Sequence, residues 1–202
     1  MNEHFRRRTE PDAPVTTQAA EGLPRRCWTV EDIEAIVEAG IISPDERFEL
    51  IGGEAVPMSH KGYRHERVKN ALARHFMVAV KPPLDVAIET TMRLGDQSLF
   101  EPDIAIVEVP SGASAYQIDQ ARLVIEVADT SLAYDTERKA AVYAAFGLKE
   151  LWVVNAVSLV TTVFRGPGDA GYASMTEVGP DTELRPLFDP GLACRLGDLR
   201  LA

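Results

Sequence analysis

The chain has 202 residues, 46% of them hydrophobic and 26% charged, which is the composition of an ordinary globular domain with a buried core. Its formal net charge of −10 at pH 7 argues against broad, sequence-independent binding to nucleic acid, although a small basic cleft on an acidic body is compatible with it. Two distant cysteines form no metal-ligand pattern, and no apolar run approaches the length of a membrane span. We therefore expect a cytoplasmic protein that does not enter the membrane.

Composition and apolar periodicity divide the chain into a polar tail, residues 1–24, and a single domain, residues 25–202. The tail is predicted to be disordered or loosely attached. In the domain, stripes at three-to-four spacing predict helices, and alternating or continuous apolar runs predict strands. In chain order we expect a helix at 30–39, a hairpin of strands at 47–51 and 54–58, a helix at 63–80, strands at 84–94 and 101–107, a loop at 110–120, a strand at 122–127, a helix at 135–146, and strands at 150–155, 159–165 and 172–178.

Local signals support several of these boundaries. Thr29 has the character of a helix N-cap, Gly52-Gly53 supplies the positive φ of a two-residue hairpin turn, and Pro82-Pro83 ends the second helix. The order of strand, helix and strand over residues 122–155 favours a parallel strand pair with a right-handed crossover. The sequence therefore predicts an α/β fold, a mixed β-sheet flanked by helices.

Two predicted strands carry a carboxylate among apolar residues. Glu126 interrupts the most apolar run of the chain, and Asp103 lies just inside the strand that Pro102 can begin. Buried acids are costly unless a metal, a proton or a partner compensates them. Each acid also has a structural alternative, because Asp103 could point into solvent and Glu126 could pair with Arg122 on the same strand face.

Lys139 is the cation that the predicted topology can bring to these acids. The loop and one helical turn after Glu126 can return its long side chain over the strand end. The alternative is an i, i+4 pair with Asp135, worth only a few tenths of a kcal/mol. Tyr143 lies one turn further on the same helix face, and His65 begins the apolar face of the second predicted helix. Simple packing is the alternative for both.

Glu49 shares a strand face with Ile51, which allows partial burial of its carboxylate. Two carboxylates at the ends of neighbouring strands could hold Mg²⁺, which binds through one or two carboxylates and keeps waters that a phosphate can replace. Such an ion acts as a Lewis acid and lowers the pKa of its bound water, while a nearby lysine neutralises charge that develops on phosphorus. The chain has no dinucleotide-binding glycine motif, Walker loop, nucleophile elbow or His-Glu-x-x-His pattern.

These residues belong to short motifs whose order and spacing resemble those of the Uma2 family, in the PD-(D/E)xK nuclease superfamily. The resemblance covers roughly Thr29 to Arg165. Its motifs are Phe48-Glu49-Leu50-Ile51-x-Gly53-Glu54, His65 at the start of a helix, Glu101-Pro102-Asp103, Val124-Ile125-Glu126-Val127, Asp135-x-x-x-Lys139-x-x-x-Tyr143 and Gly147-x-x-Glu150-x-Trp152-x-Val154.

The resemblance implies a restriction-endonuclease-like core and an endonuclease, dependent on Mg²⁺ or Mn²⁺, that hydrolyses phosphodiester bonds in DNA, with RNA as the other candidate substrate. It implies a metal site built from Asp103, Glu126 and the backbone carbonyl of Val127, with Glu49 acting directly or through water. Lys139 would then position the attacking water or stabilise the phosphate. His65 and Tyr143 would border the substrate cleft. By analogy with enzymes that cut both strands, we expect a homodimer.

The chain departs from the superfamily at Ala128, the position where a lysine usually follows the acid by two residues. The family pattern instead places the lysine on the following helix, at Lys139. Asp129-Thr130 replaces a serine and a proline, which adds a carboxylate beside the site. The net charge and Ala128 keep a second function open, that of a catalytically inactive nuclease fold that serves as a binding or assembly module.

Overall fold

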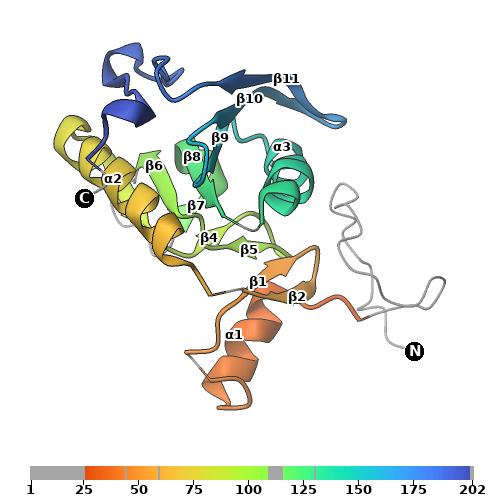
Figure 1. The fold of residues 1–202 in the computed structure, drawn as a ribbon. Coiled ribbons are helices and arrows are strands. Elements are labelled where there is room, and N and C mark those ends of the chain that lie inside the picture. Colours follow the sequence, from red (N-terminus) through yellow and green to blue (C-terminus); the bar gives the residue numbers. More distant parts are fainter. Residues whose placement is uncertain (1–25, 44, 59, 109–115, 130, 201–202) are drawn as a thin grey trace, which may run out of the picture.

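The computed structural model describes residues 26–200 apart from residues 44, 59, 109–115 and 130, so the predicted tail lies outside the described residues. Figure 1 shows how the α-helices and the short and long strands of these residues are arranged. The elements are α1 (Val30–Glu38), β1 (Phe48–Ile51), β2 (Glu54–Pro57), α2 (Tyr63–Ala79), β3 (Leu84–Ile88), β4 (Met92–Arg93), β5 (Leu99–Phe100), β6 (Ile104–Glu108), β7 (Tyr116–Gln117), β8 (Ala121–Ala128), a π-helical turn (Tyr134–Lys139), α3 (Ala140–Ala145), β9 (Glu150–Asn155), β10 (Thr161–Gly168) and β11 (Gly171–Val178). Among the described helices, none combines the length and the apolar surface that a membrane crossing requires.

The larger sheet has six strands in the order β11-β10-β9-β8-β6-β3. Its β8 and β9 run parallel, which confirms the predicted crossover, and the other neighbouring pairs are antiparallel. Helices α2 and α3 lie on opposite faces of this sheet (Figure 1). Successive side chains of β8 point to opposite faces of the sheet. Ile125 lies in the core with Phe76 of α2, and Val124 lies in the core with Tyr143 of α3.

The smaller sheet has the order β2-β1-β5-β4-β7. Helix α1 packs on it through Val30 and Ile33, which contact Leu50 of β1. The predicted N-cap of α1 is confirmed as a capping box, since the Thr29 hydroxyl accepts the Asp32 N–H at 3.0 Å and the Asp32 carboxylate accepts the Thr29 N–H at 3.0 Å. This sheet places Glu49 of β1 next to the larger sheet.

Two predicted strands and one predicted loop need correction. The segment 84–94 is not one strand, because the chain bends at Glu89, where φ is +47°, and β3 and β4 join different sheets. The strand predicted at 101–107 begins only at Ile104. The predicted loop 110–120 contains the two-residue strand β7, and its first part lies outside the described residues. Period-two alternation identifies an extended segment but not the sheet that it joins, which explains the first error.

Candidate functional site

A cavity of about 440 Å³ lies at the end of β8, where β1, the start of α2 and the π-helical turn also meet. Six of the seven residues predicted for the site line it, namely Glu49, His65, Asp103, Glu126, Val127 and Lys139. The seventh, Tyr143, is fully buried behind Glu126. The structure therefore brings together residues that lie as much as 90 positions apart in the chain, from Glu49 to Lys139.

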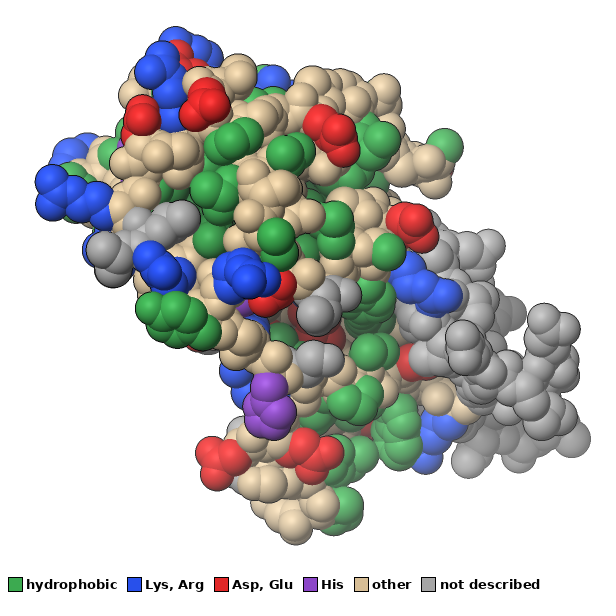
Figure 2. Space-filling model, viewed as in Figure 1, with side chains coloured by type: hydrophobic (Ala, Val, Ile, Leu, Met, Phe, Trp, Pro, Cys, Tyr) green, Lys and Arg blue, Asp and Glu red, His purple; other side chains and the backbone are tan. Residues whose placement is uncertain are grey.

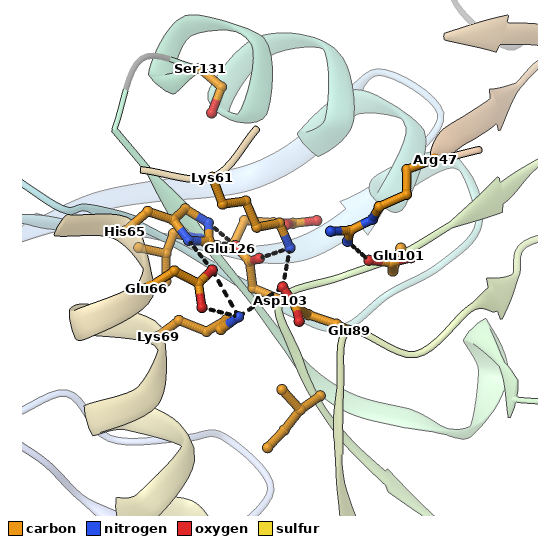
Figure 3. Close-up of polar contacts among 12 residues, drawn as sticks. Arg47, Lys61, His65, Glu66, Lys69, Glu89, Glu101, Asp103, Glu126 and Ser131 are labelled. Carbon is orange, nitrogen blue, oxygen red and sulfur yellow. Dashed lines mark hydrogen bonds and ion pairs between the residues drawn. The ribbon is translucent and has the colours of Figure 1, made fainter. Parts of the chain in front are cut away.

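Asp103 is buried rather than exposed, with 3% of its surface accessible, so the solvent-facing alternative is wrong. Its Oδ1 accepts a hydrogen bond from the Lys61 ammonium at 2.7 Å, and its Oδ2 accepts one from His65 Nε2 at 3.0 Å (Figure 3). Burial acts to raise the pKa of Asp103, but the His65 hydrogen bond and the Lys61 charge outweigh it and lower this pKa to about 2. The carboxylate is therefore ionised at neutral pH.

The backbone of Val127 completes the environment of Asp103. Its N–H donates to Asp103 Oδ2 at 2.7 Å. The antiparallel register pairs Ile104 with Ile125, and its continuation would place Val127 opposite Pro102. Because proline has no N–H, Pro102 cannot donate to the Val127 carbonyl, and the ladder ends there. This ending supports the prediction that the Val127 carbonyl can act as a ligand.

Glu126 is also buried, at 3% exposure, and it makes a different set of contacts. The Tyr143 hydroxyl donates to Glu126 Oε1 at 2.8 Å, and the Lys139 ammonium donates to the same oxygen at 3.2 Å. The alternative pair with Arg122 is wrong, because Arg122 pairs with Glu108. Burial raises the pKa of Glu126 to about 8 despite the opposing charge of Lys139. Glu126 therefore carries a proton at neutral pH, whereas Asp103 does not.

Lys139 lies between two carboxylates, with its Nζ 2.9 Å from Glu49 Oε1 and 3.2 Å from Glu126 Oε1. Burial acts to lower the pKa of Lys139, but Glu126 and Glu49 raise it well above its usual value. The alternative pair with Asp135 does not form, and the Asp135 carboxylate accepts the Ser131 hydroxyl at 2.6 Å. Asp135 is the second residue of the π-helical turn, in which its carbonyl accepts the N–H of Ala140, five residues later. This wider turn changes the i, i+4 alignment on which the alternative depended.

Sequence reasoning missed a second cationic cluster at the same cavity. Lys61 lies in the loop before α2, and its Nζ is 2.7 Å from both Asp103 Oδ1 and Glu89 Oε1. Lys69 of α2 also reaches Glu89 Oε1 at 2.7 Å and Glu66 Oε2 at 2.8 Å (Figure 3). These contacts join positions as much as 42 residues apart. The one sequence signal for Lys61 is its position one turn before His65.

Two residues of the motifs lie away from the cavity and stabilise the fold. Glu150 of β9 has no exposed surface and accepts hydrogen bonds from Trp152 Nε1 at 2.9 Å and Arg165 Nη2 at 2.6 Å. Its Oε2 accepts the Leu187 N–H at 2.6 Å, which attaches the C-terminal segment to the sheet. Glu150 and Trp152 are therefore structural members of the motif.

Comparison with known proteins identifies the family and the fold of this chain. The Uma2 family, described as "Putative restriction endonuclease", matches residues 30–197. A solved structure from Anabaena variabilis, described as a "putative nuclease belonging to DUF820", has a TM-score of 0.65 and 16% sequence identity over 80% of this chain and 93% of that chain. No curated protein gives a significant match. The likeness confirms the predicted fold class, an α/β restriction-endonuclease-like core with helices flanking the sheet. Because the family match covers most of the sequence, the chain belongs to the Uma2 family.

Proposed function

We propose that this protein is an endonuclease, dependent on Mg²⁺ or Mn²⁺, that hydrolyses phosphodiester bonds in DNA. One observation carries the proposal, namely that Asp103, Glu126 and two lysines line a single cavity of about 440 Å³. The family description "Putative restriction endonuclease" supports the same reaction. An acidic pair with adjacent cations suits a phosphate diester, because a bound metal and the lysines can neutralise the charge that develops during hydrolysis.

The donor groups fit a hard cation that keeps most of its water. Within the described ranges, no group of three or more Asp, Glu, His or Cys side chains is arranged to hold a metal ion. Asp103, Glu126 and Val127, which line one cavity, nevertheless offer two carboxyl groups and a backbone carbonyl as oxygen donors. Mg²⁺ commonly binds proteins through one or two carboxylates and retains several waters. Such a site would hold Mg²⁺ or Mn²⁺, which would act as a Lewis acid and lower the pKa of a bound water.

The remaining residues would orient these donors. The Val127 N–H and His65 fix one oxygen of Asp103, and Tyr143 and Lys139 fix Glu126. Glu49 is linked to Glu126 through the shared Lys139 ammonium and would support the metal directly or through water. Lys139 therefore acts in this proposal as a positioning residue, because its ammonium is bound by two buried carboxylates. His65 and Lys61, which line the same cavity, are the groups that a substrate phosphate would meet.

A basic face on an acidic protein gives nucleic acid an approach to this cavity. Figure 2 shows Lys and Arg side chains gathered over α2, although the net charge of the chain is −10. Arg64, Arg74 and Lys81 are exposed, and Arg67 lies with its Cζ 5.5 Å from the ring centre of the exposed Tyr63. Helix α2 begins next to Lys61 and His65 in the cavity wall. Phosphates bound along α2 would therefore lead a strand toward Asp103.

The proposal also includes a homodimer, because two cavities are needed to cut both strands in one encounter. It further includes a cytoplasmic location, where DNA and Mg²⁺ are available. Size-exclusion chromatography with light scattering tests the first, and a monomer at micromolar concentration would contradict it. Fractionation of cells tests the second.

A cleavage assay tests the main proposal. A labelled DNA duplex and an RNA of the same sequence are incubated with protein and Mg²⁺ or Mn²⁺, and with EDTA. We expect metal-dependent cleavage of DNA by the wild type and by Glu177→Gln, an exposed carboxylate on β11. We expect none by Asp103→Asn or Glu126→Gln. Cleavage that survives both site substitutions would show that the site is wrong, and cleavage of RNA alone would change the substrate.

One observation favours a second function, that of a catalytically inactive binding or assembly module. Asp103 already accepts three hydrogen bonds from protein groups, and Ala128 stands where the superfamily usually has its lysine. Metal binding without cleavage of DNA or RNA, or DNA binding that needs no metal, would support this function over the first.

A further inference from the structure

Lys61 is a cation that contacts Asp103, one of the predicted metal ligands. Its Nζ lies 2.7 Å from Asp103 Oδ1 and 2.7 Å from Glu89 Oε1, and its side chain is 14% exposed (Figure 3). We propose that Lys61 competes with the divalent metal for Asp103 Oδ1 and that Glu89 retains its ammonium when the metal binds. This inference rests on the metal site of the proposed function and adds a residue that controls its occupancy.

The hydrogen bonds at Asp103 direct a metal to the oxygen that Lys61 contacts. A carboxylate offers about four lone-pair positions, two on each oxygen. His65 Nε2 and the Val127 N–H take both positions on Oδ2. Lys61 takes one of the two on Oδ1. A metal at Asp103 must therefore use the same oxygen as the ammonium, and two cations on one oxygen repel each other.

The Lys61 ammonium is charged in this environment. Its Nζ lies between the carboxylates of Asp103 and Glu89, at 2.7 Å from an oxygen of each, so the positive charge is paired on both sides. A permanent positive charge at 2.7 Å from Oδ1 lowers the affinity of that oxygen for any other cation. Loss of this charge should therefore strengthen metal binding.

Glu89 is placed to receive the displaced lysine. Its backbone adopts a φ of +47°, in a region that residues other than glycine rarely occupy, and its N–H donates to the Asp103 carbonyl at 3.2 Å. This conformation brings the Glu89 carboxylate to the ammonium that also contacts Asp103. Strained backbone of this kind is often found at functional positions. Lys61 can leave Asp103 while it keeps its second contact.

Displacement would also supply a cation where the substrate binds. Lys61 lines the same cavity as Glu126 and Lys139, but Lys139 is buried between two carboxylates, whereas Lys61 is partly exposed. Once released from Asp103, its ammonium can contact a phosphate oxygen. One residue would then reduce the affinity for metal in the absence of substrate and neutralise charge in its presence.

The experiment measures Mn²⁺ affinity by electron paramagnetic resonance of the free ion, with full-length wild type, Lys61→Met, Lys61→Arg and Lys81→Met. Lys81 is the control, an exposed lysine beyond the other end of α2. We expect Lys61→Met to bind Mn²⁺ roughly tenfold more tightly, because the positive charge that repels the ion at Asp103 Oδ1 is removed. Lys61→Arg and Lys81→Met should bind like the wild type. The Lys61→Met variant should also cleave DNA more slowly at saturating metal.

Equal or weaker Mn²⁺ binding by Lys61→Met, or binding by none of the proteins, would overturn the inference. A general loss of structure cannot imitate the expected result, since it would weaken binding. Lys61→Gln, which removes the charge but keeps a hydrogen-bond donor, repeats the test if Lys61→Met does not fold. If affinities are equal while the wild type still cleaves DNA and Glu126→Gln does not, the inference fails and the proposed function stands.

Discussion

The Lys139 ammonium lies 3.2 Å from Glu126 Oε1, and this contact joins the helix after β8 to the acid inside it. The same ammonium lies 2.9 Å from Glu49 Oε1 on the other sheet. All three side chains are at least nine-tenths buried. The two sheets are therefore connected at the candidate site by one positive charge between two acids.

Removal of this charge should destabilise the protein strongly. In Lys139→Met the Glu49 carboxylate loses its cation and Glu126 loses a hydrogen-bond donor, and breaking a buried pair typically costs about 3–5 kcal/mol. We expect a loss of this size in the free energy of unfolding measured with urea. Lys149→Met, at an exposed position just before β9, should change it by less than about 0.5 kcal/mol. Equal effects of the two substitutions would contradict the proposed role of Lys139.

The part of the fold that surrounds this contact could be predicted from the sequence. Strand β8, the helix after it and β9 each carry a local signal, and their order predicts the parallel pair. The strands β4, β5 and β7 have two residues each, too few to show any periodicity. Their pairing depends on contacts between distant segments, which the local pattern does not contain.

The raised pKa of Glu126 predicts how stability depends on pH in the presence of EDTA. A pKa raised from 4.5 to about 8 means that the folded protein holds a proton that the unfolded chain releases. This contribution to stability is fully present below pH 4.5 and is lost as the pH rises through 8. The free energy of unfolding should therefore fall by up to about 1.4 kcal/mol for each pH unit between these values.

Glu126→Gln is the matched variant, because it cannot lose the proton. Its unfolding free energy, measured with urea from pH 5 to pH 9, should lack this decline. This pH range avoids the titration of Asp103. The lowered pKa of Asp103 contributes to the stability of the fold above pH 3.8, and this contribution is lost as the pH falls toward 2. Parallel pH profiles for the two proteins would show that Glu126 is ionised in the fold at neutral pH.

The site could be predicted only in part. Asp103, Glu126 and Lys139 stand out because a charge in an apolar run, or at helical spacing after one, is visible locally. Lys61 and Glu89 do not stand out in the sequence, because each lies in a loop, where a charged residue is usually solvated. Their pairing spans 28 residues and depends on the bend that sends β3 and β4 to different sheets.

The basic face of α2 predicts which surface binds nucleic acid. Arg67→Glu combined with Arg74→Glu reverses two charges on this face and should weaken binding of a fluorescent DNA in EDTA by at least tenfold. The slope of log affinity against log salt should become shallower by about two, one for each lost phosphate contact. The control with the same change in net charge is Arg26→Glu combined with Lys149→Glu, at exposed positions outside α2. Similar weakening by both pairs would show that net charge alone decides binding.

Glu150 and Arg165 test whether the last motif serves the fold rather than the site. Arg165→Met should leave the fully buried Glu150 without its cation and loosen the C-terminal segment, because Arg165 also donates to the Arg185 carbonyl at 2.6 Å. We expect a loss of about 3–5 kcal/mol in the free energy of unfolding. Arg122→Met breaks the partly exposed pair with Glu108 and should cost at most about 1 kcal/mol. Mn²⁺ affinity should not change in either variant under conditions where both are folded, since neither arginine lines the cavity. A weaker metal affinity in Arg165→Met alone would connect this motif to the site.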